Sequence, residues 1–218
     1  MLERRGLPGD WVHLDGKTLR QTRRKSQKLK ALHVVSAWAG QTGITWGQVA
    51  VTATSNEITA MPELLRVLDL HEKIVTTDAR GCQKAIARTM VAGGGDYILA
   101  VKDNQPTLHT ELQAAFAQTA PPPPRSGRGK STTETGHGRH EHRAVRVVPA
   151  RGHLSAAQET AWGGVVTLVM VTRVVWCQAT GGGVRRSVTF SVVCGLMHGA
   201  SGARFGGTGA LRTGCTGW

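Results

Sequence analysis

The chain has 218 residues, enough to bury a hydrophobic core, and its 40% hydrophobic content argues against wholesale disorder. Lys and Arg number 27 against 14 Asp and Glu, giving a formal net charge of +13. The excess lies at the ends, with nine basic and three acidic residues in 1–30 and five basic and no acidic residues in 160–218. A basic surface favours polyanionic partners, with nucleic acid ahead of an anionic membrane.

The cysteine spacing and the apolar runs predict the compartment. Four cysteines show no CxxC or metal-finger spacing, so nothing indicates a disulfide framework. The first residues, MLERRGLPGDW, lack the apolar run of a signal peptide. The most apolar window, 162–176, is too short to span a membrane and contains Arg173. We therefore expect a soluble protein of the cytoplasm.

The order of the predicted elements indicates a mixed α/β fold. Residues 11–20 predict a strand that leads into a polar turn at 15–17. Alternating and apolar runs predict further strands over 31–39, 44–51, 73–77 and 96–102. The first two of these are expected to form a hairpin. Helical spacing, with Asn56 as an N-cap and Pro106 in a first turn, predicts helices over 57–70, 81–91 and 106–118.

The composition of the chain changes at residue 121. Pro, Gly and charged residues dominate 121–135, which predicts a linker or loop. Alternating residues resume afterwards, so we expect a β-rich segment over 136–180. Residues 181–218 hold 11 of the 28 glycines and show no sustained period, so we expect a poorly ordered tail there.

Two aspartates lie where site residues of α/β proteins commonly lie. Asp15 is in or at the end of the first predicted strand, and Asp78 ends a later one. Two neighbouring carboxylates repel each other, and Mg²⁺, which takes one or two carboxylates beside water and phosphate, relieves that repulsion. The structural alternative is that Asp15 forms a turn before Gly16 and Asp78 caps a helix. On pattern alone this alternative is the stronger interpretation.

Five ordered sequence blocks resemble the ISAs-type insertion-sequence transposases, which include the bacterial H-repeat-associated proteins. The blocks are HLDGKTLR (13–20), LHVVSAWA (32–39), GQVAVTATSNEITAMPELLRVLDL (47–70), IVTTDARGCQKAIA (74–87) and GGDYILAVKDNQPTLH (94–109). Two further segments, GHGRHEHRAVRV (136–147) and WGGVVTLVMVTR (162–173), extend the resemblance to about residue 180. Five blocks in this order and at consistent spacing make the resemblance highly specific.

The resemblance implies an RNase H-like mixed sheet with flanking helices and a DDE mechanism. In that mechanism three acidic residues hold two Mg²⁺ ions, with Mn²⁺ as a substitute, for DNA strand cleavage and transfer. Asp15 matches the first acid and Asp78 the second, so residues 1–120 form a partial RNase H-like catalytic core. The implied partner is DNA, both the ends of the insertion sequence and its target, and we also expect a homo-oligomer on that DNA.

The third acid is missing from its expected place. In related transposases it is the Glu of a His-Trp-Gly-Ile-Glu-Asn block in a C-terminal helix, and no such block occurs here. Read one base out of frame, however, the codons for 207–218 permit that block. We therefore expect a frameshift near 181–183, and a core that is incomplete at the C-terminus and cut short at both ends. Glu141 is a weak third-acid candidate, because its block resembles a separate part of the family pattern.

These features predict a DDE transposase fragment that is defective in catalysis. The residues expected to contact the DNA backbone are Lys17, Arg20, Arg23, Arg24, Lys25 and Lys102. One alternative is a basic, non-catalytic DNA-binding remnant that competes with intact transposase. Another is an unrelated metal nuclease, since one fold supports several functions.

Sequencing the source DNA tests the frameshift. We expect a one-base shift near codons 181–183 to restore the His-Trp-Gly-Ile-Glu-Asn block downstream, because glycine codons begin with GG and three in a row can form a slippery run. The hypothesis is wrong if no one-base shift restores the block.

Overall fold

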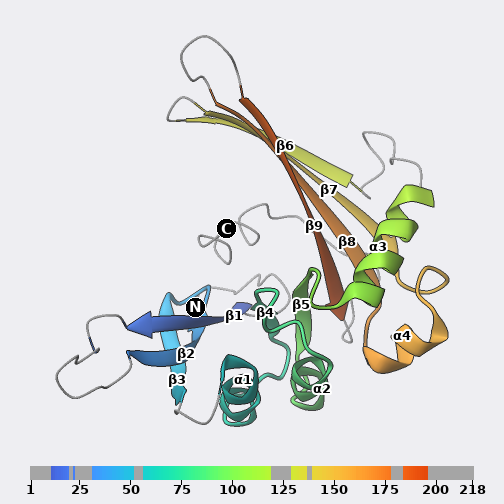
Figure 1. Ribbon diagram of the computed structural model, residues 1–218. Coiled ribbons are helices and arrows are strands. Elements are labelled where there is room, and N and C mark those ends of the chain that lie inside the picture. The colour runs from blue at the N-terminus through green and yellow to red at the C-terminus, as the bar shows by residue number, and fades with distance from the viewer. Residues whose placement is uncertain are drawn as a thin grey trace, which may run out of the picture. The chain divides into compact units, whose positions relative to one another are not determined.

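The computed structural model describes residues 11–19, 22, 31–51, 56–118, 129–136, 139–177 and 184–195. The chain divides into two compact units, and Figure 1 labels the elements of both. The first comprises Met1–Leu99, Trp162–Gly164 and Gly195–Trp218. The second comprises Ala100–Ala161 and Val165–Cys194.

The first unit is built on a five-stranded mixed sheet with the order β3-β2-β1-β4-β5. Its strands are β1 (Trp11–Leu19), β2 (Leu32–Ala39), β3 (Ile44–Val51), β4 (Ile74–Thr77) and β5 (Asp96–Val101). β2 pairs antiparallel with β1 and β3, whereas β4 pairs parallel with β1 and β5. The predicted mixed α/β class is confirmed, and the strand order is consistent with the RNase H-like fold.

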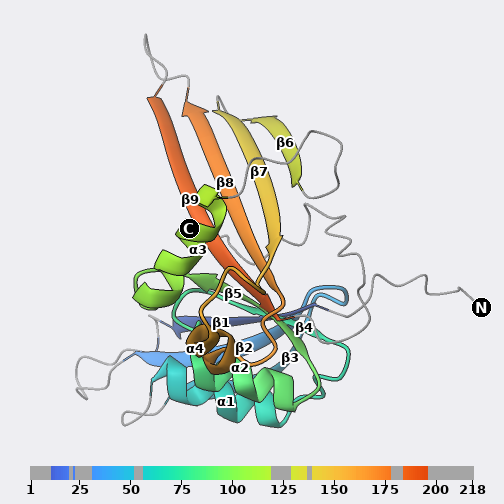
Figure 2. The ribbon, with the colours of Figure 1, turned by 90° about the vertical axis from the view of Figure 1, so that its right-hand side faces the viewer.

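Two helices cover one face of this sheet, as Figures 1 and 2 both show. They are α1 (Glu57–Arg66), which precedes β4, and α2 (Lys84–Ala92), which connects β4 to β5. α1 packs through four buried residues at helical spacing: Ala60, Met61, Leu64 and Leu65. The core also includes Trp162, whose carbonyl and that of Gly163 accept hydrogen bonds from the Tyr97 hydroxyl at 3.5 and 3.3 Å.

A capping box sets the start of α1, as predicted from Asn56. The Asn56 side chain accepts a hydrogen bond from the Thr59 N–H, and the Thr59 hydroxyl accepts one from the Asn56 N–H, both at 3.0 Å. The helix ends at Arg66 rather than at residue 70, because the Val67 N–H already bonds back to the Leu64 and Leu65 carbonyls.

The second unit holds an antiparallel sheet in which each strand pairs with the next along the chain. Its strands are β6 (Gly129–Gly136), β7 (Arg139–Pro149), β8 (Thr167–Cys177) and β9 (Val184–Gly195). Its helices are α3 (Pro106–Gln118) and the short α4 (Ala156–Ala161). Arg146 of β7 links the sheet to α3, because its guanidinium donates to the Phe116 carbonyl at 3.1 Å and lies 5.4 Å from the centre of the Phe116 ring.

Three local expectations need correction. The turn predicted at 15–17 is wrong, because β1 continues to Leu19 and pairs with β2 along this whole stretch. β6 lies partly inside the predicted linker 121–135, since its backbone pairs with β7. β9 lies inside the tail 181–218, where alternating residues pair with the full length of β8. The rest of the tail and the basic stretch 23–30 lie outside the described residues.

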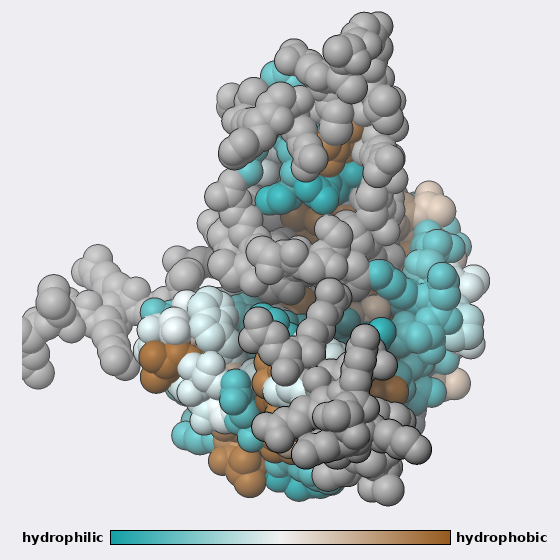
Figure 3. Space-filling model, turned by 60° about the vertical axis from the view of Figure 1, so that its left-hand side comes forward, coloured by the Kyte–Doolittle hydropathy of each residue, from teal (hydrophilic) through white to brown (hydrophobic). Residues whose placement is uncertain are grey.

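Exposed hydrophobic side chains are scattered. On the face drawn in Figure 3, the described residues form small hydrophobic areas separated by hydrophilic ones. The large hydrophobic residues that are exposed are Leu19, Leu32, Ile44, Ile58, Val67 and Val166. Within the described ranges, no helix has both the length and the apolar character needed to cross a membrane.

The packing of α1 on the sheet predicts a large effect for one core substitution. Leu64 is 1% exposed, so Leu64→Ala should lower the free energy of unfolding by about 2–5 kcal/mol. Val67, just beyond the end of the same helix, is 77% exposed, so Val67→Ala should change it by no more than about 0.5 kcal/mol. Urea unfolding of both variants measures the difference, and equal effects would contradict the packing described here.

Candidate functional site

The parallel pairing of β1 with β4 brings the two predicted aspartates to the same level of the sheet. Leu14 of β1 pairs with Thr77 of β4, and the residue that follows each of them is an aspartate, Asp15 and Asp78. Neighbouring strands lie about 4.8 Å apart. Two residues far apart in the sequence therefore lie side by side where β4 ends.

Asp15 presents a free carboxylate. Its side chain is exposed, and among the described residues none pairs with it. Successive side chains of a strand alternate between the two faces, so Asp15 shares a face with His13. A 2.7 Å hydrogen bond joins His13 Nδ1 to the Thr76 hydroxyl of β4, so this face runs continuously across both strands. Burial lowers the pKa of His13, which favours the neutral ring in this contact.

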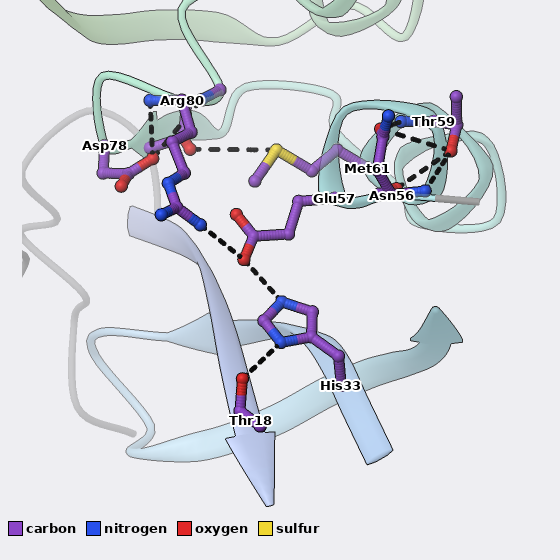
Figure 4. A network of polar contacts seen from close by, with 10 residues as sticks. Thr18, His33, Asn56, Glu57, Thr59, Met61, Asp78 and Arg80 are labelled. Carbon is purple, nitrogen blue, oxygen red and sulfur yellow. Dashed lines mark hydrogen bonds and ion pairs between the residues drawn. The ribbon is translucent and has the colours of Figure 1, made fainter. Parts of the chain in front are cut away.

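Asp78 is held by the turn that it begins. One of its carboxylate oxygens, Oδ1, accepts hydrogen bonds from the Arg80 N–H at 3.0 Å and the Gly81 N–H at 3.3 Å (Figure 4). The interpretation of Asp78 as a helix cap is wrong, because the N-cap of α2 is Gln83, and the Asp78 carboxylate instead closes the turn that precedes this helix. The second carboxylate oxygen makes no contact with a described residue, so closing the turn and binding a ligand are compatible.

The donor set suits a hard divalent cation. Mg²⁺ is commonly held by one or two carboxylates, with substrate phosphates and water in the remaining positions, and the Asp15–Asp78 pair supplies two. Among the described residues, no group of three or more His, Cys, Asp and Glu side chains could hold a metal ion. In this part of the chain a cation would therefore depend on the two aspartates.

A row of polar side chains extends from Asp15 across the sheet, and the sequence analysis missed it. Asp15 pairs with Ser36 of β2, which in turn pairs with Gln48 of β3. The Gln48 side-chain amide donates to the Ser36 hydroxyl at 3.1 Å. Lys17 is exposed and lies two residues beyond Asp15, on the same face of β1. Ser36 and Gln48 interrupt apolar strands, which is the signal that could have identified them.

Glu57 was also missed, although it lies close to the aspartate pair. It occupies the first turn of α1, where an acidic residue is normally explained by the helix dipole. Figure 4 shows its carboxylate between His33 of β2 and Arg80 of the Asp78 turn. Its Oε1 lies 2.5 Å from His33 Nε2 and 3.4 Å from Arg80 Nη1. Only tertiary structure brings these three side chains together.

Glu141, the weak third-acid candidate, lies on β7 of the second unit and is engaged by two arginines. Arg143 forms an ion pair with one of its oxygens, and Arg173 donates a 2.7 Å hydrogen bond to the other. The hydrogen bond from Arg173 holds the pKa of the Glu141 carboxyl below its usual range, and the charge of Arg143 acts in the same direction. A cation at Glu141 would have to displace both guanidinium groups.

The predicted DNA-contacting residues are only partly visible in the structure. Lys17 is exposed on β1, and Lys102 follows β5 in the second unit. The other four, Arg20, Arg23, Arg24 and Lys25, lie outside the described residues.

Cys82 follows the Asp78 turn, but its thiol is not suited to nucleophilic chemistry. Its side chain is fully buried, and burial raises the pKa of the thiol to about 12. The reactive thiolate is therefore scarce at neutral pH.

The strand order is consistent with the RNase H-like class of proteins, and comparison with known proteins identifies the family. The family described as "Transposase DDE domain" matches residues 9–173. This match covers most of the chain, so the chain belongs to the DDE transposase family, as the resemblance predicted.

Curated relatives agree with this assignment. The chain is 41% identical over 162 residues to an uncharacterized protein encoded in the dhlA 3′ region of Xanthobacter autotrophicus, covering 74% of this chain and 53% of that protein. YhhI and YbfD of Escherichia coli K12, both named as candidate H repeat-associated transposases, are 42% and 41% identical over 62% of this chain. The chain spans 35% of YhhI and 53% of YbfD, about a third to a half of these relatives.

A solved structure adds nothing to the assignment. A methyltransferase from Clostridium acetobutylicum aligns with a TM-score of 0.22 and 7% identity, over 60% of this chain and 44% of that one. A likeness this low does not bear on the fold.

The arginine pairs of Glu141 predict a pH-dependent contribution to stability. Arg143 pairs directly with Arg173 across β7 and β8, so Glu141→Gln leaves two like charges opposite each other. We expect a loss of about 1–3 kcal/mol at pH 7. Because the folded pKa is lowered, the loss should be full above the ordinary carboxyl value near 4.5 and shrink as pH falls through the lowered value.

Urea unfolding at a series of pH values measures this contribution. Glu159→Gln on α4 is the matched control, because the Glu159 side chain makes no hydrogen bond or ion pair with a described residue. A loss that is independent of pH, or that is equal in the control, would contradict the assigned role of the arginine pairs.

Proposed function

We propose that this chain carries part of the catalytic core of a DDE transposase, which cuts and joins the DNA of an insertion sequence with the help of divalent cations. The observation that supports this most directly is the Asp15–Asp78 pair, at one level of adjacent parallel strands in a chain of this family. The family assignment alone does not assign these residues a role. Their register is the independent argument, because it creates a two-carboxylate donor set.

The two aspartates contribute differently to such a site. Divalent cations bound to carboxylates activate a water or a 3′-hydroxyl and stabilise the leaving oxygen in phosphoryl transfer, and here Mg²⁺ would serve, with Mn²⁺ as its substitute. Asp15 offers a carboxylate that no described residue pairs with. Asp78 offers one oxygen while the turn amides hold the other, so its orientation is set before a ligand arrives.

Basic residues beside the aspartates provide the attraction for DNA. Lys17 shares the face of Asp15, and the sequence continues into the basic stretch that includes Arg20 and Arg23. Such side chains bind phosphates with little sequence selectivity, and this binding weakens as salt rises. The proposed partners are the ends and the target of the insertion sequence, bound by a homo-oligomer in the cytoplasm.

The proposal includes a defect in strand transfer. The family's third acid is missing from its expected block, and Glu141 is engaged by Arg143 and Arg173. The same two observations favour the second candidate function, a non-catalytic DNA-binding remnant that competes with intact transposase. The two functions share the DNA contacts and differ in the chemistry at Asp78.

Incubation of the full chain with terminal-inverted-repeat DNA and Mg²⁺ or Mn²⁺ separates the two functions. We expect DNA binding and slow, cation-dependent nicking without strand transfer. Asp78→Asn should abolish the nicking, because the amide cannot replace the anionic ligand oxygen. Asp69→Asn is the matched control, since Asp69 likewise accepts a bond from a nearby backbone N–H, that of His71, but lies outside the pair.

Each remaining outcome has a definite meaning. DNA binding without nicking identifies the remnant and rules out catalysis by this chain. Nicking that survives Asp78→Asn contradicts the role of Asp78, and the absence of DNA binding contradicts both functions.

A further inference from the structure

Glu57 contacts each of the segments that position the aspartate pair. Its side chain is only 12% exposed and extends from the first turn of α1. The carboxylate lies against Gly16 of β1, His33 of β2 and Arg80 of the Asp78 turn (Figure 4). One carboxylate therefore touches the residue next to Asp15 and the turn that begins at Asp78.

Gly16 provides the space that this carboxylate occupies. A Cβ atom at Gly16 would lie 2.6 Å from both Cδ and Oε1 of Glu57, closer than real Cβ contacts allow. The backbone at Gly16 is not in the left-handed region, so glycine matters here for space rather than for its φ, and a Cβ atom would force the Glu57 carboxylate to move. The Asp15–Gly16 pair thus combines an exposed carboxylate on one face of β1 with a cradle for Glu57 on the other.

His33 holds Glu57 from the side of the sheet. Thr18 and His33 pair across β1 and β2, and the Thr18 hydroxyl lies 2.8 Å from His33 Nδ1, which fixes the ring. The opposite ring nitrogen, Nε2, lies 2.5 Å from Glu57 Oε1. Glu57 is thereby fastened to the pair of strands that carries Asp15.

Arg80 holds Glu57 from the side of the turn. Its guanidinium lies 3.4 Å from the Glu57 carboxylate, and its backbone N–H donates to Asp78 Oδ1. The guanidinium is 73% exposed, so this contact alone contributes little to stability. The Arg80–Glu57 contact matters for geometry. It joins the turn whose backbone orients Asp78 to α1, the helix whose Glu57 lies against Gly16.

We propose that Glu57 is a positioning residue of the Asp15–Asp78 cation site, which keeps the Asp78 turn in register with β1 without itself binding the cation. The inference rests on the proposed function, since it presumes that this pair binds a divalent cation. Groups that support metal ligands typically change metal affinity 10- to 100-fold when they are mutated. Glu57 connects the two segments, because its carboxylate lies against Gly16, next to Asp15, and against Arg80 of the Asp78 turn.

Titration of the full chain with Mn²⁺ alone, followed by calorimetry, tests the proposal. Glu57→Gln preserves the size of the side chain but removes the charge that pairs with Arg80. We expect its Kd for Mn²⁺ to rise by roughly 10- to 100-fold. Glu63→Gln is the matched control, because Glu63 lies on the same helix, is exposed and contacts no described side chain. It should bind Mn²⁺ as the wild type does.

Urea unfolding of the same variants distinguishes positioning from a purely structural role. If Glu57→Gln lowers stability but leaves the Kd for Mn²⁺ unchanged, the proposal is wrong. If Asp78→Asn also leaves Mn²⁺ binding unchanged, or if the wild type binds no Mn²⁺, the cation site of the proposed function fails as well. Loss of binding in Asp78→Asn with normal binding in Glu57→Gln overturns the role of Glu57 alone.

Gly16→Ala, which leaves Glu57 unchanged, keeps the test decisive if Glu57→Gln does not fold, and unchanged Mn²⁺ binding in this variant would overturn the proposal. Gly16→Ala should displace the carboxylate and weaken Mn²⁺ binding in the wild-type background. In a Glu57→Ala background the same change should have no further effect, because the atoms that the new methyl group would meet are gone. Equal effects of Gly16→Ala in the two backgrounds would overturn the proposal.

Discussion

The parallel pairing of β1 with β4 is the constraint on which the candidate site depends. It sets Leu14 opposite Thr77 and so determines that the next residues, Asp15 and Asp78, share one level of the sheet. A slip of one residue in this register would turn every side chain of a strand to the other face and separate the two carboxylates. The buried Val12, Leu14 and Val75 resist such a slip, because it would expose them to water.

The two aspartates of the site are unequal in their surroundings. Asp15 stands on a continuous strand with its carboxylate exposed, whereas Asp78 stands on a turn that uses one of its oxygens. A strand within a sheet is stiff, but a turn at the end of a four-residue strand needs support from elsewhere. Glu57 contacts this turn through Arg80, which is the basis for the positioning role proposed for it.

Local sequence patterns predicted most of the strands and helices. They did not predict which side chains strand pairing and helix packing bring together. Alternation located β3 at its observed bounds, and the capping residue Asn56 located the start of α1. None of the six residues of α4 is buried, so the sequence has no apolar stripe there from which this helix could be predicted. Asp15 and Asp78 were predicted from strand ends and resemblance, and the structure places them at one level of adjacent strands. Their neighbours Ser36 and Glu57 escaped, because they reach the site only through strand pairing and helix packing.

The two sheets differ in how far along the chain their partners lie. In the second unit each strand pairs with its successor, so β6 to β9 can zip up through neighbouring hairpins with little loss of chain entropy. The bond between His13 and Thr76 spans 63 residues and requires a large loop to close first. The aspartate pair therefore forms only once this loop has closed, and a cation that binds it would stabilise the folded state specifically.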